Sequence, residues 1–399
     1  MSSQKATRQQ TKEHNRDLVL KTIFANETIS RAEIARVTRL TRTTVSNIVS
    51  SLLEEGLVSE VGFGESIGGK APVLLSLIAN ARYLIGIDLE QDKFIGAIIN
   101  LRGEIKELVE IPTEKKDGQE AINLIYQLLD QLLATDWTPI IGIGVGAPGL
   151  MNLKEGIVVK AVNLNWENLP LADLLRARYR LPISVLNDSQ ASAIGEYVHG
   201  EGYDPNENLI VVNVKHGLSA GILINGKLFQ GDGGGAGEIG HVVVQKDGIF
   251  CRCGKRGCLE TLASTRAIIQ RAKILAPEAK SSLLSKQSDE ISLETIIDAF
   301  LAHDPLAEEI VFEAGQYLGT FIANLISILN IQKIILIGEM TRFGDAWLQS
   351  VRNAMSQSSY NKLAQNTVIE IGKTDTHSCI LGASASMLMD NYSLLFRNS

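Results

Sequence analysis

The first eighty residues show the apolar spacing of short helices followed by strands. In the stretch ISRAEIARVTRLTRTTVSNIVSSLLEEGLV, which starts at Ile29, Ser30 and Glu33 have the spacing of a capping box, so a helix is predicted to begin at Arg31. Thr41 can cap a second helix that Gly56 ends. The residues expected to face inward are Ile34, Ala35 and Val37 in the first helix and Val45, Ile48, Val49, Leu52 and Leu53 in the second.

These two helices, preceded by an amphipathic helix around residues 12–25, have the pattern of a helix-turn-helix unit. The following stretch, LVSEVGFGESIGGKAPVLLSL, predicts two strands around a glycine-rich loop, which would form a wing. The second helix begins with short polar side chains and one arginine, which suit base edges and phosphates in a major groove. The predicted DNA contacts are Arg42, Thr43, Ser46 and Asn47, with Lys70 at the wing tip.

The rest of the chain contains a duplicated strand pattern. Residues 84–100, LIGIDLEQDKFIGAIIN, align without gaps on residues 209–225, LIVVNVKHGLSAGILIN, and each copy has the pattern strand, turn, strand. Asn225-Gly226 adds a strong hairpin signal, and buried strands are predicted at 140–146, 183–186 and 333–338. Residues 276–305 are expected to be a helix-poor surface excursion. The duplication predicts two similar α/β lobes with a cleft between them.

Charge separates the head of the chain from the body. Residues 1–42 carry 9 Lys and Arg against 4 Asp and Glu, a balance of +5, whereas residues 81–399 carry 28 against 37, a balance of −9. A basic head on an acidic body predicts that only the head meets nucleic acid. No apolar run reaches the ~18 residues of a membrane span, and the N-terminal stretch lacks the apolar core of a secretory signal, so we expect a cytoplasmic protein.

Three of the four cysteines lie in one short segment, GEIGHVVVQKDGIFCRCGKRGCLE, at residues 237–260. Cys251, Cys253 and Cys258 follow His241, and the glycines at 254 and 257 let the backbone curl. Three thiolates and one imidazole form a closed tetrahedral site, so the predicted cofactor is a structural Zn²⁺. A chance grouping of buried cysteines is the alternative, and Cys379, which stands alone, is expected to be a buried thiol.

The motifs GEIGH and CRCGKRGCLE resemble the signature of the ROK family, which comprises repressors, open reading frames of unknown role and sugar kinases. The resemblance also covers GIGVGAPGLMN at 142–152, NLNWENLPL at 163–171, LNDSQASAIGEY at 186–197 and LINGKLFQGDGGGAGEIGH at 223–241. It implies a duplicated, actin-like (ribonuclease-H-like) α/β body. The N-terminal winged helix resembles the repressor branch, which includes the xylose and N-acetylglucosamine repressors. The expected domains are a winged helix-turn-helix at 1–80 and a two-lobe sugar-sensing body with a zinc-binding loop at 81–399.

The resemblance also implies which residues bind sugar. Carboxylates accept hydrogen bonds from adjacent hydroxyls, an asparagine both donates and accepts, and a histidine can give one ring nitrogen to zinc and the other to a hydroxyl. The implied sugar-binding residues are Asn187, Asp188, Glu238, His241 and Glu260. Glu238 and Glu260 could alternatively be solvated surface acids.

The chain departs from the kinases of the family at their phosphate-binding loops. The first loop, DxGGT in kinases, reads Asp88-Leu89-Glu90-Gln91-Asp92 here, so both glycines are missing and two carboxylates, Glu90 and Asp92, are present. The second loop, GTGxGGG in kinases, has Lys215 and His216 in place of small residues. A Gly-Gly pair that borders the nucleotide in kinases reads Gly338-Glu339-Met340. These departures predict weak ATP binding and no enzyme activity. Asp188, which would be the general base of a kinase, is retained, so residual activity is left open.

Together these patterns predict a sugar-responsive transcriptional regulator, in the first instance a repressor of carbohydrate-utilisation genes. It would bind operator DNA through the winged helix and a sugar or sugar phosphate in the cleft, as a homo-oligomer, dimer or tetramer, because one helix-turn-helix reads only a half-site. No membrane partner is expected. Two alternatives remain at this stage: an ATP-dependent sugar kinase with an accessory DNA-binding head, and a regulator controlled by a protein partner. An activator, rather than a repressor, also fits these patterns.

Overall fold

The computed structural model describes residues 8–65, 71–200, 206–287, 290–389 and 392–396. The chain divides into two compact units, and each is described by itself. The first unit contains residues 1–186 and 383–399, and the second contains residues 187–382. No helix in the described ranges is long and apolar enough to span a membrane.

The N-terminal part of the first unit is a winged helix. Its three helices and its small antiparallel sheet, of order β1-β3-β2, are α1 (Arg8–Phe24), β1 (Ile29–Ser30), α2 (Arg31–Thr38), α3 (Arg42–Glu54), β2 (Val58–Phe63) and β3 (Val73–Leu77). The predicted capping box is present, because Ser30 Oγ accepts the Glu33 N–H at 3.2 Å while the Ser30 N–H donates to the Glu33 carboxylate at 2.9 Å. Thr41 caps α3 by accepting the Thr44 N–H.

One expectation for the inward face of α2 was wrong. Val37 is 61% exposed, whereas Thr38 is buried and donates its hydroxyl to the Ile34 carbonyl. The helix is only eight residues long, so its buried stripe is narrow and Val37 lies beyond it. In α3, Val45, Val49 and Leu52 are buried as predicted, while Ile48 and Leu53 are half-buried.

The winged helix shares an apolar cluster with the end of the chain. Tyr392, Leu394 and Leu395 belong to η7 (Tyr392–Phe396), and they are buried in the same cluster as Val19, Leu20 and Ile23 of α1. The Arg102 guanidinium also donates to the carbonyls of Phe24 at 2.8 Å and Asn26 at 3.0 Å. Residues distant in sequence therefore anchor the winged helix within the first unit.

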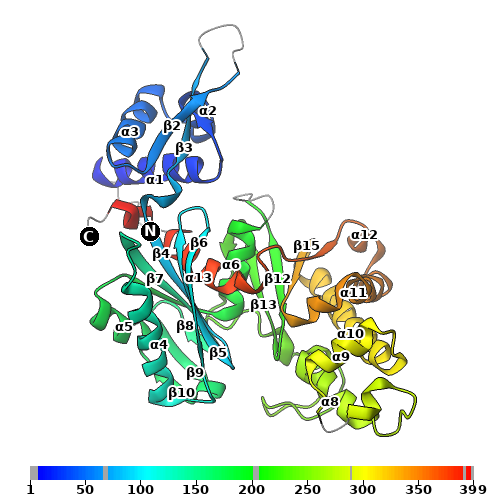
Figure 1. Cartoon of the computed structure of the whole chain (residues 1–399). Helices are drawn as coiled ribbons and strands as arrows, with labels where there is room; N and C mark the ends of the chain where they lie inside the picture. The colour runs from blue at the N-terminus through cyan, green and yellow to red at the C-terminus, as the bar shows by residue number, and fades with distance from the viewer. Residues whose placement is uncertain (1–7, 66–70, 201–205, 288–289, 390–391, 397–399) are drawn as a thin grey trace. The chain divides into compact units, whose positions relative to one another are not determined.

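The main sheet of the first unit has five strands in the order β11-β7-β4-β5-β6. These strands and the flanking elements are η1 (Ala79–Ala81), β4 (Tyr83–Leu89), β5 (Lys93–Asn100), β6 (Ile105–Pro112), α4 (Gly118–Leu133), β7 (Ile140–Ala147), α5 (Leu171–Tyr179) and β11 (Ile183–Asn187), whose last residue opens the second unit. A small three-stranded sheet of order β10-β9-β8 accompanies them, built from β8 (Leu150–Asn152), β9 (Ile157–Ala161), η2 (Val162–Leu164) and β10 (Trp166–Leu169). Helix α4 packs against β5 and β6 (Figure 1).

The second unit has a five-stranded sheet of order β14-β13-β12-β15-β16. Its N-terminal elements are α6 (Asp188–His199), β12 (Leu209–Val214), β13 (Leu218–Ile224), β14 (Lys227–Leu228), η3 (Ile239–His241), α7 (Glu260–Ala263) and α8 (Thr265–Leu275). Its remaining elements are η4 (Leu283–Gln287), α9 (Leu293–Leu301), α10 (Pro305–Leu329), β15 (Lys333–Ile337), η5 (Glu339–Phe343), α11 (Gly344–Ser358), α12 (Asn361–Ala364), β16 (Val368–Ile371) and η6 (Asp375–His377), followed by α13 (Ser378–Met389), which continues into the first unit.

The predicted duplication is confirmed at its hairpins. In the first copy β4 pairs antiparallel with β5, and in the second β12 pairs antiparallel with β13. The turn between β13 and β14 is formed by Asn225 and Gly226, whose φ angles of 52° and 69° are those of the hairpin turn that this dipeptide predicts. The two mixed sheets, each with a parallel neighbour for its first strand, establish the expected duplicated α/β fold.

The expected surface excursion at 276–305 was wrong. Helix α9 lies in this segment, capped by Ser292, and its residues Ile296, Ile297, Ala299 and Phe300 are buried in the core of the second unit. The helical period of these apolar positions is the signal that the polar flanks obscured. Asp304 then caps α10, because its carboxylate accepts the N–H groups of Leu306 and Ala307.

Candidate functional site

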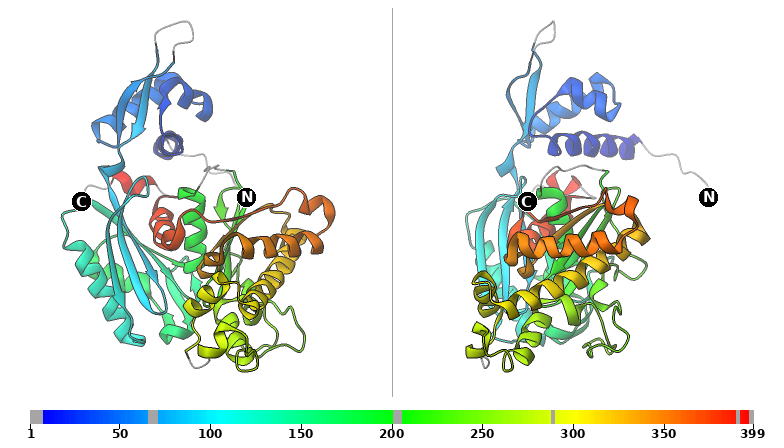
Figure 2. Two further views of the ribbon diagram at one scale, coloured as in Figure 1. Left: turned by 45° about the vertical axis from the view of Figure 1, so that its right-hand side comes forward. Right: turned by 90° about the vertical axis from the view of Figure 1, so that its right-hand side faces the viewer.

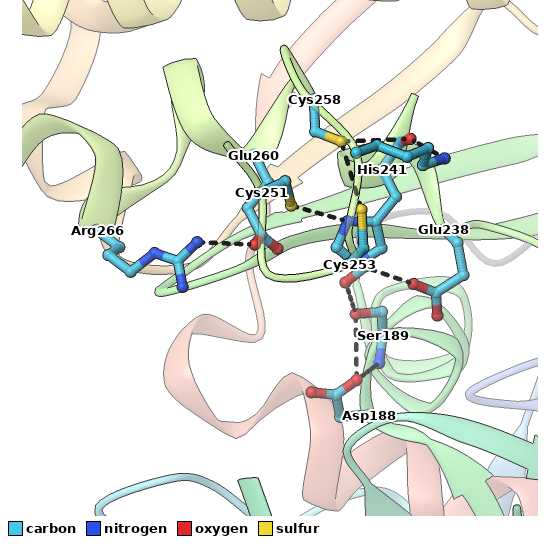
Figure 3. A network of polar contacts seen from close by, with 11 residues as sticks. Asp188, Ser189, Glu238, His241, Cys251, Cys253, Cys258, Glu260 and Arg266 are labelled. Carbon is cyan, nitrogen blue, oxygen red and sulfur yellow. Dashed lines mark hydrogen bonds and ion pairs between the residues drawn. The ribbon is translucent and has the colours of Figure 1, made fainter. Parts of the chain in front are cut away.

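The predicted metal ligands come together in the second unit. The candidate ligand atoms of His241, Cys251, Cys253 and Cys258 all lie within 4.8 Å of one another. The Nδ1 atom of His241 is 3.6 Å from the Sγ atom of Cys251, and the Sγ atoms of Cys253 and Cys258 are also 3.6 Å apart. Figure 3 shows the three thiols and the imidazole facing a common centre.

These separations fit a tetrahedral zinc ion. With Zn–S of about 2.3 Å and Zn–N of about 2.0 Å, the edges of the tetrahedron are about 3.6 Å for S···N and about 3.8 Å for S···S. Burial, with hydrogen bonds from Cys253 and Cys251, raises the pKa of Cys258 to about 12, and a bound cation would lower this pKa because it stabilises the thiolate. The residues present therefore fit a metal ion with thiolate and imidazole ligands.

The backbone of the metal loop is shaped by glycines, as the sequence predicts. Gly254 and Gly257 have φ angles of 93° and 70°. A side chain at Gly257 would also lie 1.6 Å from the carbonyl oxygen of Gln245. The loop is closed by bridges that pair Val243 with Cys258 and Phe250 with Arg256. This backbone brings the histidine and the three cysteines to one point although they span eighteen residues of sequence.

Glu260 directly follows the metal loop and is buried beside an arginine. It is the first residue of α7 and only 7% exposed. The Arg266 guanidinium donates to Glu260 Oε1 at 3.2 Å, and both side chains are largely shielded from solvent. A side chain at Gly217, in the hairpin between β12 and β13, would lie 3.1 Å from Glu260 Oε2. Glu260 is therefore a buried, paired carboxylate, and the surface-acid alternative is wrong for it.

Glu238 lies on the other side of His241. Its Oε2 atom is 4.0 Å from His241 Nε2, the ring nitrogen that points away from Cys251. Partial burial raises the pKa of the Glu238 carboxyl; His241 lowers this pKa, whereas the charges of Asp188 and Glu260 raise it further. Glu238 is therefore the acid that interacts with the imidazole and with both of the other acids, and Figure 3 shows these four residues in one view.

Gly237 fixes the backbone that presents Glu238. Its φ of 101° is left-handed, and a side chain there would lie 1.8 Å from the carbonyl oxygen of Ala220 in β13. The Gly237 carbonyl also accepts the Ala220 N–H at 2.8 Å. The GEIGH motif therefore runs in contact with the sheet, so that Glu238 and His241 project from a supported segment.

Asn187 and Asp188 stand at the start of α6. The Asn187 side-chain oxygen accepts the N–H groups of Ser189 at 3.0 Å and Gln190 at 3.3 Å, so it caps the helix. This cap holds the Asn187 side chain in place, and its contact with a sugar stays a prediction. Asp188 Oδ1 accepts the Ser189 N–H at 2.7 Å, at a helix terminus that favours a negative charge.

Two of the three loops that differ from the family's kinases, those with Lys215 and Glu339, contact the start of α8. The Thr265 N–H donates to the Lys215 carbonyl at 3.0 Å, and the Thr265 hydroxyl donates to Glu339 Oε2, also at 3.0 Å. A carboxylate of the protein therefore already stands at this helix N-terminus, where a phosphate would otherwise be favoured. This arrangement disfavours a nucleotide phosphate at the same position.

The predicted DNA-contacting residues lie on one end of α3. Arg42, Thr43 and Asn47 are exposed, and Ser46 is half-buried. None of them is needed for the core, which takes its apolar residues from the other face of the helix. Strands β2 and β3 pair antiparallel as the wing requires, while Lys70 lies outside the described residues.

Sequence reasoning missed Arg266. It lies six residues after Glu260, in the second residue of α8, and its role depends on the break between α7 and α8 at Ser264. Within one helix, residues six positions apart would point in different directions, so no periodic pattern signals the pair. The pairing of Glu260 with Arg266 therefore becomes evident only in the three-dimensional structure.

Comparisons with known proteins agree on both parts of the chain. A model of the ROK family matches residues 84–389, and a model of winged helix-turn-helix DNA-binding domains matches residues 15–59. The xylose repressor of Caldicellulosiruptor bescii is 35% identical over 387 residues, which cover 95% of this chain and 96% of the repressor.

A kinase and a regulator structure complete the comparison. A glucokinase of Halalkalibacterium halodurans is 34% identical over 309 residues, which cover 75% of this chain and 93% of the kinase. A crystal structure of a ROK family transcriptional regulator, described as a homologue of the E. coli MLC protein, has a TM-score of 0.84 and 28% identity, and covers 97% of this chain and 98% of its own. The chain belongs to the ROK family, in the form that carries an N-terminal winged helix-turn-helix.

Proposed function

We propose that this protein is a sugar-responsive transcriptional repressor. Its winged helix binds operator DNA, and a sugar bound by the second unit changes the affinity for that DNA. The protein acts as a homo-oligomer in the cytoplasm, where operator DNA and the sugar meet. The genes it controls are those of carbohydrate utilisation, as the xylose repressor with 35% identity suggests.

The observation that carries this proposal is that acidic side chains lie near His241, the histidine that also faces the three cysteine thiols. The charges of Asp188 and of Glu260 each raise the pKa of Glu238, and His241 turns Nε2 toward Glu238 while Nδ1 faces the thiols. Carboxylates accept hydrogen bonds from adjacent hydroxyls and an imidazole can donate to or accept from one, as sugar recognition requires. The buried pair of Glu260 and Arg266 adds a fixed acceptor whose orientation is set before ligand binds.

A zinc ion would be held by His241, Cys251, Cys253 and Cys258. Its contribution when bound is structural, because four protein ligands leave no open position for water or substrate. The side chains of the protein, and not the metal, then contact the sugar. His241 would be a ligand of the metal and Glu260 lies two residues after the last cysteine, so the metal loop would fix two members of the proposed sugar site.

The DNA-binding half of the proposal is supported by the surface of α3. Its first turns expose one arginine and short polar side chains, and residues 1–42 have a balance of +5. An exposed N-terminal turn of this composition suits the major groove, while the paired strands β2 and β3 lead to the wing. One helix-turn-helix reads one half-site, so two copies of the chain would bind a two-fold operator.

The sugar-kinase alternative is weaker, although a glucokinase is 34% identical to most of the chain. Glu339 accepts the Thr265 hydroxyl at the N-terminus of α8, where it would repel a phosphate. Glu90 and Asp92 add acids at the first of the kinase loops. Asp188 remains, and in the proposed repressor it accepts a sugar hydroxyl without taking its proton.

The test begins with a thermal-shift screen of monosaccharides and their phosphates. Operator affinity is then measured by fluorescence anisotropy, with and without the best sugar, at one fixed salt concentration. We expect several-fold weaker operator binding in the presence of the sugar, which corresponds to a coupling of about 1–3 kcal/mol. Equal operator affinity at saturating sugar would refute the sensor proposal and favour control by a protein partner. Stronger operator binding with sugar would identify a regulator of the opposite sign.

A further inference from the structure

The four candidate metal ligands differ in how far solvent reaches them. Cys251 and Cys258 are both 0% exposed and His241 is half-buried, whereas Cys253 is exposed. The segment that carries the three cysteines joins η3 to α7 as an irregular loop (Figure 2). A reagent in solution therefore reaches the thiol of Cys253 before it reaches the other two thiols.

The sequence around Cys253 is positively charged. Residues 242–259 contain four basic residues and one acidic residue, a balance of +3. All five are exposed, and they are Lys246, Asp247, Arg252, Lys255 and Arg256. Lys255 also holds the loop closed, because its Nζ atom donates to the His241 carbonyl at 2.7 Å. Cysteines that react with oxidants have such accessible and positively charged surroundings, since nearby cations stabilise the thiolate that attacks the oxidant.

A second thiol lies beside Cys253. The Sγ atoms of Cys253 and Cys258 are 3.6 Å apart. A disulfide has an S–S distance of about 2.05 Å, so the two sulfurs need to approach by only about 1.5 Å. Gly254 directly follows Cys253, and no atom lies within 4 Å of the position that a Cβ would take there. The turn that carries Cys253 therefore has room for this shift.

The backbone holds the two cysteines to different degrees. Cys258 forms a backbone bridge with Val243, on the far side of the loop. Cys253 lies in a tight turn, which the Gly254 N–H closes by donating to the Cys251 carbonyl at 3.0 Å. Cys253 is therefore the cysteine that can move, and Cys258 is a fixed thiol within its reach. An accessible thiol next to a resolving thiol is the arrangement of a redox-sensitive cysteine pair.

We propose that Cys253 is an oxidation site, at which a peroxide produces a disulfide between Cys253 and Cys258 and displaces the bound metal. The Cys253 thiolate attacks one oxygen of hydrogen peroxide, the O–O bond breaks, hydroxide leaves, and the sulfur becomes a sulfenic acid. The Cys258 thiolate then attacks the Cys253 sulfur, and the S–S bond forms as a second hydroxide leaves. Both hydroxides take a proton from solvent. Two thiolates thus lose two electrons, and hydrogen peroxide is reduced to two waters.

The disulfide removes two of the four metal ligands. His241 and Cys251 alone do not complete a tetrahedral site, so the zinc ion is released. The consequence for regulation rests on the proposed function, in which the metal loop would fix His241 and Glu260 in the sugar site. Oxidation should then weaken sugar binding. A dithiol reductant regenerates both thiols, and added zinc restores the site.

The experiment treats the zinc-loaded full chain with hydrogen peroxide and follows released zinc with a chelating dye. We expect loss of zinc together with loss of two hydrogens from the intact mass, and a dithiol with added zinc should reverse both changes. The disulfide is located by tryptic mapping without reductant, because trypsin cleaves after Arg252, Lys255 and Arg256. The peptide that begins at Cys253 and the peptide that contains Cys258 then remain joined only through the expected disulfide.

The test variant is Cys253→His, because histidine can bind zinc but cannot form a disulfide. We expect it to retain zinc at a peroxide concentration that releases zinc from wild type. The matched control is Cys379→Ser, which should release zinc as wild type does, since Cys379 is 1% exposed and lies outside the metal cluster. The mapping of wild type needs no variant, so it decides the question if Cys253→His does not fold or does not bind zinc.

Three results would overturn the proposal: retention of zinc by peroxide-treated wild type, a disulfide that joins Cys251 to Cys258, or sulfinic acid at Cys253 in place of a disulfide. Release of zinc from zinc-loaded Cys253→His at the wild-type rate would also overturn it. The thermal-shift assay with the best sugar then tests the consequence, and equal sugar affinity of the oxidised and reduced forms would overturn that part. If the disulfide forms reversibly but the reduced protein binds no sugar, the oxidation site stands and the proposed function fails.

Discussion

Replacing Glu260 with glutamine is the sharpest test of the proposed sugar site. Glu260 is 7% exposed, and its Oε1 atom accepts from Arg266 at 3.2 Å. Glutamine keeps the shape and still offers Oε1 to the arginine, so the fold should be retained. The change removes the negative charge that would accept a sugar hydroxyl.

The magnitude follows from the difference between charged and neutral hydrogen bonds. A bond to a charged group contributes about 1.5–3 kcal/mol and a neutral one about 0.5–1.5 kcal/mol. The variant should therefore lose about 1–1.5 kcal/mol of sugar binding, which is close to a tenfold rise in Kd. At a sugar concentration of about 100 times the wild-type Kd, ligand stabilisation should fall from about 2.7 to about 1.4 kcal/mol.

The assays are calorimetric sugar titration, thermal unfolding with and without sugar, and operator binding. Operator affinity without sugar should be unchanged, while the sugar concentration for half-release of operator should rise by the same factor as Kd. The control is Glu294→Gln, another arginine-paired glutamate, which is exposed on α9 and pairs with Arg342 at 2.6 Å. Wild-type sugar affinity in Glu260→Gln would refute the reasoning, as would a large loss of stability in the absence of sugar.

Four further predictions concern the metal, the DNA, catalysis and pH. Elemental analysis should find one zinc per chain, and Cys253→Ser should lower both zinc content and sugar affinity; zinc-free protein with three reactive thiols would contradict this. Arg42→Ala should weaken operator binding by about 1–3 kcal/mol, whereas Arg176→Ala, an exposed arginine of α5, should not. No sugar phosphorylation is expected with ATP and magnesium; turnover of roughly 1 per second or faster that Asp188→Asn abolishes would establish the kinase instead. Burial lowers the pKa of His199 to about 4. Since this value is below the ordinary value of about 6.5, the neutral form is stabilised above pH 6.5, and about 2 kcal/mol of stability should be lost as the pH falls to about 5. His199→Gln should flatten that slope in urea unfolding, and an unchanged slope would exclude His199 as its cause.

The sequence by itself determined the local structure of the winged helix and the metal site. Ser30 with Glu33, and Thr41, mark helix starts because a cap is a contact between residues three positions apart. Asn225-Gly226 likewise sets its own hairpin turn. The short spacing of Cys251, Cys253 and Cys258, with glycines that allow the loop to close, predicted the metal cluster before any tertiary contact was known. Each of these signals is local, and local geometry is encoded in adjacent residues.

Only the tertiary structure decided what depends on contacts between distant segments. It exposed Val37, placed α9 in the core, and paired Glu260 with Arg266 across a break between helices. Burial and pairing are properties of the packed chain, and residue periodicity describes one element at a time. The physical reason is that a helix or strand fixes which side chains share a face, whereas its neighbours decide whether that face is covered.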